Sequence, residues 1–404
     1  MLVLQILLAS AAVIVLAWRP RSWTAAALPA GFAMIEVVLG ATSAGTLGRS
    51  LLEAAPIGVF LVSVIWLARL ADRAGLAQRL AGVLARNARG QRRRLYVLVC
   101  TLCAGLTATV SLDGAVVLMI PVLLALAPRE PQLFRPLFFG TVAVANAFSF
   151  AVPQGNPTNL VVMSQLGLGP EAFVIHLFVP AVLAAVVCIV ALAFAERRRL
   201  RGVYHPAGGS PTPFSADEKF AAAALTVAAV AGVASPWVGV APWLVLSAVA
   251  AIAFAAARTT GRPTPSPRVP WRVWVQVAAL LVLFDAVFAG LHAPLFTGPS
   301  LAALVVLSLT ASATASSINN LPASVVFATM LGTRGLPAYA TLAGLSVGAL
   351  ATPHGSVATL IAFDRAGAAA DQLATSRYLT LWIPATVFAT SAATLCLWFI
   401  ARVH

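Results

Sequence analysis

Charged side chains are scarce in this 404-residue sequence. They make up only 9% of it, and a single lysine, Lys219, stands beside 25 arginines. Hydrophobic residues make up 60%, which is too much for the surface of a water-soluble globule of this size. The composition excludes a soluble enzyme or binding domain and predicts an integral membrane protein.

Cysteine is also rare. The four cysteines all lie in apolar runs: Cys100, Cys103, Cys188 and Cys396. Such positions are typical of small core residues rather than of a disulfide framework or a metal site. The sequence contains no phosphate-binding loop or nucleotide motif, so we expect neither a metal nor a cofactor. The first 18 residues lack a basic leader and a clear cleavage site, which predicts an uncleaved first span.

Ten hydrophobic stretches have the length of membrane spans: 2–18, 23–40, 51–68, 137–165, 173–195, 220–239, 242–257, 273–290, 336–363 and 378–400. Two others, 95–127 and 299–331, are each 33 residues long. One crossing needs roughly 20 residues and two need roughly 40. Arms of about 15 residues would reach about 22 Å, so we predict that both stretches form re-entrant hairpins.

The basic residues then divide unequally between the two sides of the membrane. With these spans, 23 of the 26 basic residues fall in loops on one side, and the other side holds Arg49, Arg334 and Arg402. An arginine excess marks cytoplasmic loops, so we expect a plasma (inner) membrane protein with both termini outside. Because the charge is divided among alternate loops, it does not indicate binding to nucleic acid.

The two halves of the chain repeat one layout. Each has five spans and a hairpin between the third and the fourth; the first half starts outside and the second starts inside. We therefore predict an all-α membrane protein made of two inverted repeats, residues 1–201 and 219–404, joined by a cytoplasmic linker, 202–218. Secondary transporters have this architecture and bind substrate near the midplane between the repeats.

A related motif interrupts the fourth span of each half. It reads VPQGNPTNL at 152–160 and TPHGSVATL at 352–360. Gly155 can adopt a conformation that unwinds the helix, after which Asn156 is suited to cap a new half-helix that begins at Pro157. Ser356 is expected to cap the second copy. Broken backbone at this depth must be buried in protein or line a wet cavity.

The hairpin tips, TVSLDGA at 109–115 and SSINNLP at 316–322, supply the opposite wall of the predicted site. We pair Ser111 with Ser317 and Asp113 with Asn319. Helix ends with unpaired amide groups would converge there on one volume. The candidate substrate-binding residues are Ser111, Asp113, Gly155, Asn156, Thr158, Asn159, Ser317, Asn319, Asn320, Gly355 and Ser356.

Ionisable groups inside a membrane are candidates for function because hydrocarbon disfavours charge. Asp113 is the first candidate for a proton carrier, and a structural helix cap is its alternative role. His354 could relay the proton, since a free imidazole titrates near neutral pH; a purely structural histidine is equally consistent with the sequence. Asp285 is a second candidate on the proton path, whereas Glu36 is expected either to extend toward the membrane surface or to face a polar neighbour.

These segments resemble the arsenical pump membrane protein (ArsB-type) family of the ion transporter superfamily. The resemblance rests on Asp113-Gly114-Ala115 followed by Pro121, on the tip 319–322 and on the crossover 352–360. It implies export of arsenite or antimonite driven by the proton gradient, in some members with a soluble ATPase partner, and elevator-like relatives often form homodimers. Two departures are Leu112 before Asp113, where the family usually has Asn, and His354, where an aliphatic residue is common.

Other functions are consistent with parts of the sequence. The first crossover has a form shared with dicarboxylate and sodium/proton carriers, although an ionised Asp113 would repel a dicarboxylate. One carboxylate with hydroxyls and carbonyls could hold sodium. A hydrolase using Ser111, Asp113 and His354 would lack an oxyanion motif. A passive channel would not need a protonatable tip.

Overall fold

The computed structural model describes residues 2–18, 23–128, 130–204, 213–267, 269, 271–288, 300–331, 335–371, 373 and 375–403. Within these residues the chain is helical, with one isolated β-bridge between Gln91 and Val203. In this described part of the chain, seven helices are long and apolar enough to cross a membrane. The prediction of an all-α integral membrane protein agrees with this.

The helices of the first half are α1 (Leu2–Trp18), α2 (Thr24–Val38), α3 (Ala44–Arg73), α4 (Leu76–Asn87), α5 (Arg92–Thr109), α6 (Leu112–Leu126), α7 (Pro131–Ala147), α8 (Pro157–Leu166), α9 (Pro170–Ala195) and α10 (Arg197–Leu200). Two 3₁₀ turns, η1 (Ser149–Ala151) and η2 (Pro153–Gly155), separate α7 from α8. The fourth predicted span is therefore broken, as expected.

The helices of the second half are α11 (Ala216–Ala234), α12 (Pro242–Thr259), α13 (Trp271–Phe288), α14 (Leu301–Ile318), α15 (Asn320–Leu331), α16 (Leu336–Gly348), α17 (Val357–Ala366), α18 (Ala368–Asp371) and α19 (Thr375–Val403), with a 3₁₀ turn, η3 (Ser235–Val238), after α11. Irregular backbone between α16 and α17 again breaks the fourth span. Each predicted hairpin is a pair of helices joined by a tight turn.

The hairpin arms differ in length from those expected. The first arms, α5 and α14, have 18 residues each, while the second arms, α6 and α15, have 15 and 12. At 1.5 Å per residue, α14 is about 27 Å long, and it counts among the seven helices able to cross a membrane. The depth of the hairpins thus stays a prediction.

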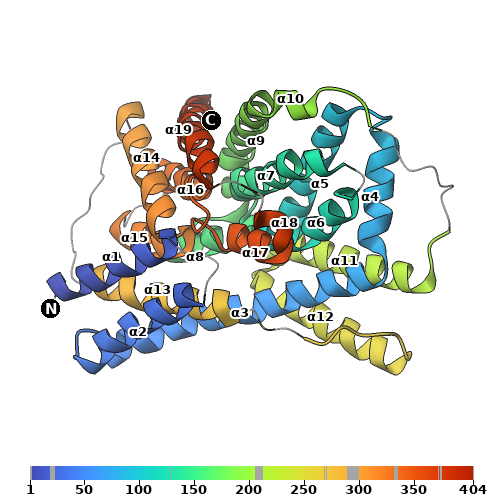
Figure 1. Ribbon diagram of the computed structural model, residues 1–404. Coiled ribbons are helices and arrows are strands. Elements are labelled where there is room, and N and C mark those ends of the chain that lie inside the picture. Colours follow the sequence, from blue (N-terminus) through green and yellow to red (C-terminus); the bar gives the residue numbers. More distant parts are fainter. Residues whose placement is uncertain are drawn as a thin grey trace.

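The helices form three layers in Figure 1. One outer layer contains α9, α14 and α19, and the other contains α2, α3, α12 and α13, with most of the hairpin and broken-helix segments between them. Many contacts come in matching pairs. For example, α2 packs on α13 and α3 on α12, and α6 packs on α17 and α15 on α8. The second arm of each hairpin therefore lies against the half-helix of the other half.

Ion pairs join the segments that the arginine count predicts to be cytoplasmic. We call this surface, formed by residues 69–94, 130–135, 196–204, 213–219 and 258–266, the Arg-rich face. Its ion pairs include Arg79–Glu218, Arg92–Glu130, Arg135–Glu196, Arg199–Glu196 and Arg262–Asp217. Because these loops are far apart in sequence and contact one another, they lie on one side of the molecule.

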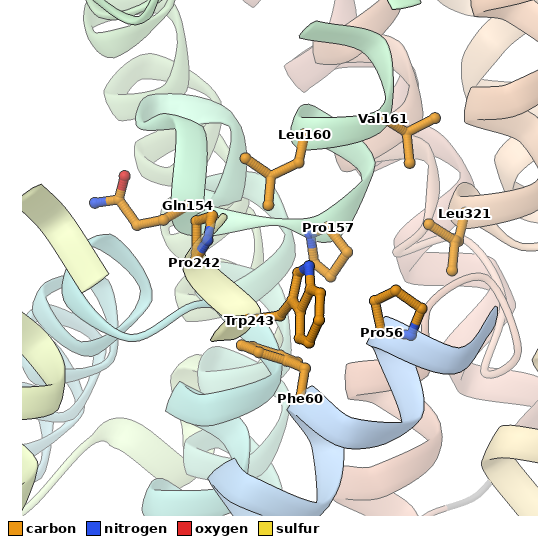
Figure 2. A pocket seen from close by; sticks show the side chains of 9 residues that line it. All are labelled: Pro56, Phe60, Gln154, Pro157, Leu160, Val161, Pro242, Trp243 and Leu321. Atoms are coloured by element: carbon orange, nitrogen blue, oxygen red, sulfur yellow. The ribbon is translucent and has the colours of Figure 1, made fainter. Parts of the chain in front are cut away.

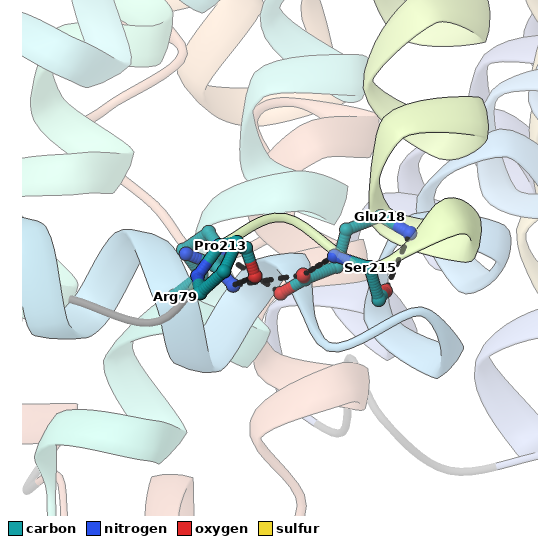
Figure 3. A network of polar contacts seen from close by, with 4 residues as sticks. All are labelled: Arg79, Pro213, Ser215 and Glu218. Carbon is teal, nitrogen blue, oxygen red and sulfur yellow. Dashed lines mark hydrogen bonds and ion pairs between the residues drawn. The ribbon is translucent and has the colours of Figure 1, made fainter.

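Arg79 on α4 is the centre of one such contact (Figure 3). Its guanidinium donates to both carboxylate oxygens of Glu218, at 2.6 and 2.8 Å, and to the carbonyl of Pro213 at 3.1 Å. Glu218 also accepts from the backbone N–H of Ser215, whose hydroxyl caps α11 in return. The pair therefore connects the amphipathic α4 to the start of the second half.

We expect Arg79→Gln to lower the midpoint of thermal unfolding of the purified protein by several degrees, because Glu218 would lose its bidentate partner while remaining enclosed. Arg86→Gln removes an exposed arginine from the same helix and serves as the control. Equal unfolding midpoints for the two variants would show that the Arg79–Glu218 ion pair adds no stability beyond the effect of one positive charge on this helix.

Candidate functional site

The first hairpin turns at Ser111, which has φ 143° although it is not a glycine. Its hydroxyl accepts a hydrogen bond from the N–H of Gly114 at 3.2 Å and so caps α6. Asp113 follows in the first turn of that helix with 3% exposure. Since Ser111 is the cap, the alternative capping role of Asp113 is not the one observed, and Oδ1 of Asp113 is buried without a hydrogen-bond partner among the described residues.

The second hairpin turns at Asn319, which also has a positive φ, 85°. Its amide oxygen accepts from the N–H of Leu321 at 3.1 Å, and its amide nitrogen donates to the carbonyl of His354 at 2.8 Å. By backbone conformation Asn319 therefore matches Ser111, and not Asp113 as the sequence pairing had it. Leu321 stands where the first tip has Asp113, so the two tips differ in charge.

The crossovers have the predicted caps. Oδ1 of Asn156 accepts from the N–H of Thr158 at 3.0 Å, Pro157 begins α8, and Oγ of Ser356 accepts from the N–H of Thr359 at 3.1 Å. The glycines act differently from the prediction, because neither has a positive φ. A Cβ on Gly155 would lie 2.3 Å from the carbonyl oxygen of Ser149, and one on Gly355 would lie 2.4 Å from that of Ala349. Close backbone approach, rather than unusual torsion, requires glycine at both positions.

Each tip is connected to the crossover of its own half by the side chain between Pro and Gly of the motif. Nε2 of Gln154 donates to the carbonyl of Ala108 at 2.7 Å, and Nε2 of His354 lies 3.2 Å from the carbonyl of Ser317. A carbonyl can only accept, so Nε2 of His354 carries the hydrogen. The second connection also includes the N–H of Asn320, which donates to the carbonyl of Gly355 at 2.8 Å. His354 is thus the counterpart of Gln154.

One predicted side chain, that of Ser317, does not join the buried cluster. The hydroxyl of Ser317 is exposed and donates to the carbonyl of Ala313 at 2.9 Å, because Ser317 precedes the tip by two residues and lies on the outer side of α14. The side chain of Asp285 lies outside the described residues. Glu36 is fully buried and accepts from the hydroxyl of Thr42 at 3.0 Å. Of its two predicted roles it therefore has the polar neighbour, and it does not extend to the surface.

Asn146 is a residue that sequence reasoning missed. It is fully buried on α7, and its amide nitrogen donates to the carbonyl of Val142 at 2.9 Å and to the hydroxyl of Thr359 at 3.3 Å. The second bond joins α7 of one half to α17 of the other. A lone asparagine in the apolar run TVAVANAF was the signal that could have identified it. Ser346 precedes Gly355 by the same number of residues as Asn146 precedes Gly155. The hydroxyl of Ser346 is buried without a described partner.

Most of the unpartnered buried atoms in this region can only accept hydrogen bonds. The amide nitrogens of Asn146, Gln154 and Asn159 all donate to carbonyl groups, which fixes the orientation of each amide. Five buried acceptor atoms of the tips, the crossovers and Asn146 have no described partner: Oδ1 of Asp113, Oδ1 of Asn146, Oε1 of Gln154, Oδ1 of Asn159 and, in the neutral ring, Nδ1 of His354. The hydroxyl of Thr158, which can donate or accept, is buried without a described partner as well. No arginine or lysine occurs in 108–115, 149–160, 316–322 or 349–360.

A small apolar cavity lies beside the first crossover (Figure 2). Its volume is about 160 Å³. Side chains of α3, α12, the first crossover with α8, and α15 surround it: Pro56, Phe60, Gln154, Pro157, Leu160, Val161, Pro242, Trp243 and Leu321. The cavity separates part of the crossover from α3 and α12, so that the crossover is incompletely packed against these helices.

Among the described residues, no group of three or more His, Cys, Asp or Glu side chains gathers that could hold a metal ion. The buried cysteines Cys100, Cys103 and Cys188 are free thiols in the helix core. The chemistry of the tips and crossovers is therefore that of neutral polar groups around one carboxyl group.

Comparison with known proteins agrees with a transporter. A family model described as citrate transporter matches residues 11–343. A Bacillus subtilis (strain 168) protein with the name "Putative arsenical pump membrane protein" is 23% identical over 391 residues, which cover 85% of this chain and 87% of that protein. The crystal structure of the Alcanivorax borkumensis YdaH transporter covers 89% of this chain and 88% of its own, with 16% identity and a TM-score of 0.46.

Proposed function

Because the chain belongs to the citrate transporter family within the ion transporter superfamily, we propose that it exports arsenite or antimonite from the cytoplasm in exchange for protons. The family consists of transporters, so the chain is an integral membrane transporter and not an enzyme. The identity of the cargo and the use of protons are our proposal, and the name of the Bacillus subtilis relative supports the choice of cargo.

The observation that carries this proposal is the set of unpartnered acceptors. Buried acceptors favour a ligand that brings donors, since an unpaired buried polar atom costs about 1–3 kcal/mol. Arsenous acid is an uncharged trihydroxide at neutral pH and offers three O–H donors. Citrate offers mainly carboxylate acceptors and calls for cationic partners, which the tips and crossovers lack. We therefore favour arsenite over citrate, despite the description of the family.

A sodium ion is the second candidate cargo, because carbonyl, amide and carboxylate oxygens also suit a hard cation. One experiment separates the candidates. Proteoliposomes with an imposed proton gradient are given arsenite, citrate or sodium, and uptake of each is measured. We expect gradient-dependent uptake of arsenite alone among the three. Uptake of citrate or sodium without arsenite would overturn the proposal, and uptake that ignores the gradient would indicate a channel.

We further propose that the two halves are inverted repeats, each with one re-entrant hairpin and one broken helix. The support is the pairing of contacts, in which α6 packs on α17 as α15 packs on α8. The paired glycines, Gly155 and Gly355, also approach a carbonyl six residues earlier in each half. An inverted pair brings both crossovers and both tips to one central site, as in transporters that work by alternating access.

In this mechanism Asp113 alternates between two partners. In the inward-facing state its carboxylate accepts a hydrogen bond from one arsenite hydroxyl. The amide oxygens of Asn146 and Asn159 accept from the other hydroxyls. After the tips and crossovers have moved, arsenite leaves and Asp113 takes a proton from outside, which it releases to the cytoplasm on return. The cavity between the first crossover and α3 and α12 leaves room for such movement.

His354 provides a test of the connection between tip and crossover. We expect His354→Gln to retain most arsenite transport, because glutamine makes the equivalent bond at position 154. His354→Ala should lose most transport, because it leaves the carbonyl of Ser317 without its donor. If the glutamine variant transports arsenite but no longer responds to the proton gradient, His354 is a proton relay and not only a structural bridge.

A further inference from the structure

A hollow of about 590 Å³ opens on the Arg-rich face, away from the tips and crossovers. It lies where α6 ends, α7 begins, and α10 and α18 approach. The lining residues are Ala127, Pro128, Pro131, Gln132, Phe134, Arg135, Arg199, Ala369 and Leu373. Nothing in the proposed transport mechanism uses this hollow, and its occupant does not depend on the identity of the cargo.

The polar part of the hollow has an excess of positive charge. Nε of Arg135 donates to Glu196 at 2.8 Å, and Nη1 of Arg199 donates to the other oxygen of Glu196 at 2.6 Å. One carboxylate thus accepts hydrogen bonds from two guanidinium groups. The side chain of Arg135 is 15% exposed and that of Arg199 is 42% exposed. One positive charge remains uncompensated within this triad.

The surrounding segments add to that charge. The described residues of 92–94, 130–135 and 196–201 carry eight arginines against two glutamates, a net charge of +6. Contacts join these segments to one another: Arg92 pairs with Glu130 and donates to the carbonyl of Arg201. The field of this cluster attracts anions to the hollow.

Apart from Arg135, Arg199 and Gln132, the walls are apolar. Phe134 and Leu373 are buried, and alanine and proline side chains complete the lining. A free inorganic anion gains nothing from such walls, whereas an amphiphile can place its headgroup on the arginines and its glycerol and first methylenes against them. The hollow also lies at the start of α7, one of the helices of the described chain that are long and apolar enough to cross a membrane.

We propose that this hollow binds the phosphate headgroup of an anionic phospholipid from the leaflet on the Arg-rich face. The planar guanidiniums of Arg135 and Arg199 offer pairs of N–H donors that match phosphate oxygens. Basic pockets between membrane helices on the cytoplasmic side suit such headgroups. The bound lipid would join the loop after the first hairpin to α10 and α18.

The test uses native mass spectrometry of the full-length protein with added phosphatidylglycerol, phosphatidylcholine or glycerol phosphate. We expect preferential retention of phosphatidylglycerol and about tenfold weaker retention in Arg199→Gln, since a charge-assisted hydrogen bond is lost. Arg198→Gln is the matched control, because it removes the same charge from an exposed position on the same helix outside the hollow.

Equal retention in the two variants would overturn the proposal, because the lipid would then respond only to overall charge. Displacement of phosphatidylglycerol by glycerol phosphate at equal concentration would also overturn it and would assign the hollow to a soluble anion. A rise in thermal stability with phosphatidylglycerol in the unaltered protein, absent in Arg199→Gln, would support it even if that variant is less stable.

Discussion

Asp113→Asn should reduce gradient-driven accumulation of arsenite in proteoliposomes to the level of liposomes without protein. Asparagine preserves the size and the acceptor oxygen of the side chain but cannot exchange a proton. The variant should therefore lose the coupling of transport to the proton gradient more than it loses arsenite binding. Arsenite should still equilibrate slowly down its own gradient in this variant, because the other acceptors remain.

The matched control is Glu36→Gln, which also replaces a buried carboxyl group by its amide. Glu36 is bonded to Thr42 and belongs to none of the tips or crossovers, so its variant should accumulate arsenite as the unaltered protein does. Full accumulation in Asp113→Asn would remove Asp113 from the coupling role. Equal loss in both variants would point to a general effect on folding or insertion.

The second large effect is expected at the paired glycines. Gly155→Ala and Gly355→Ala would each place a methyl group within 2.4 Å of a backbone carbonyl oxygen, which no rotation of a side chain can relieve. Overpacking that forces the backbone to shift typically costs about 1–3 kcal/mol and occasionally more. We expect each variant to show a much lower yield of monodisperse protein and to lose arsenite transport.

Gly105→Ala is the control for these substitutions. Gly105 lies in the first hairpin, where an added Cβ meets nothing within 4 Å, and alanine favours helix over glycine by about 1 kcal/mol. Its yield and stability should therefore be unchanged or better. Normal yield and transport in either crossover variant would mean that the crossover backbone can separate from the preceding turn.

Much of the layout could be predicted from hydrophobic length alone. The stretches 95–127 and 299–331 are too long for one crossing and too short for two, which predicted that each chain segment turns back on itself. The structure has a pair of helices in each stretch, while their re-entrant depth stays a prediction. Capping preferences likewise identified Asn156 and Ser356, because a polar residue before a new apolar helix has few other uses.

Other features depended on tertiary contacts that no local pattern records. The correspondence between the two tips differs by two residues from the predicted pairing. The reason is that the backbone torsions of Ser111 and Asn319 set the position of each turn, whereas the prediction relied on the similarity of side chains. Ser317 proved exposed because it precedes that turn. Asn146 was missed because its partner, Thr359, lies in the other half of the chain. Glycine is needed at position 155 because the carbonyl of Ser149, six residues earlier, leaves no space for a Cβ.

The backbone torsions of Ser111 and Asn319 fall where glycine alone is comfortable, and such positions typically store about 1–3 kcal/mol each. Glycine at either place would ease the torsion but would remove the cap that begins the following helix. Both turns therefore retain backbone strain for as long as the capping hydrogen bond is made. Any conformational step that breaks this hydrogen bond would release the strain, and the released energy would favour that step.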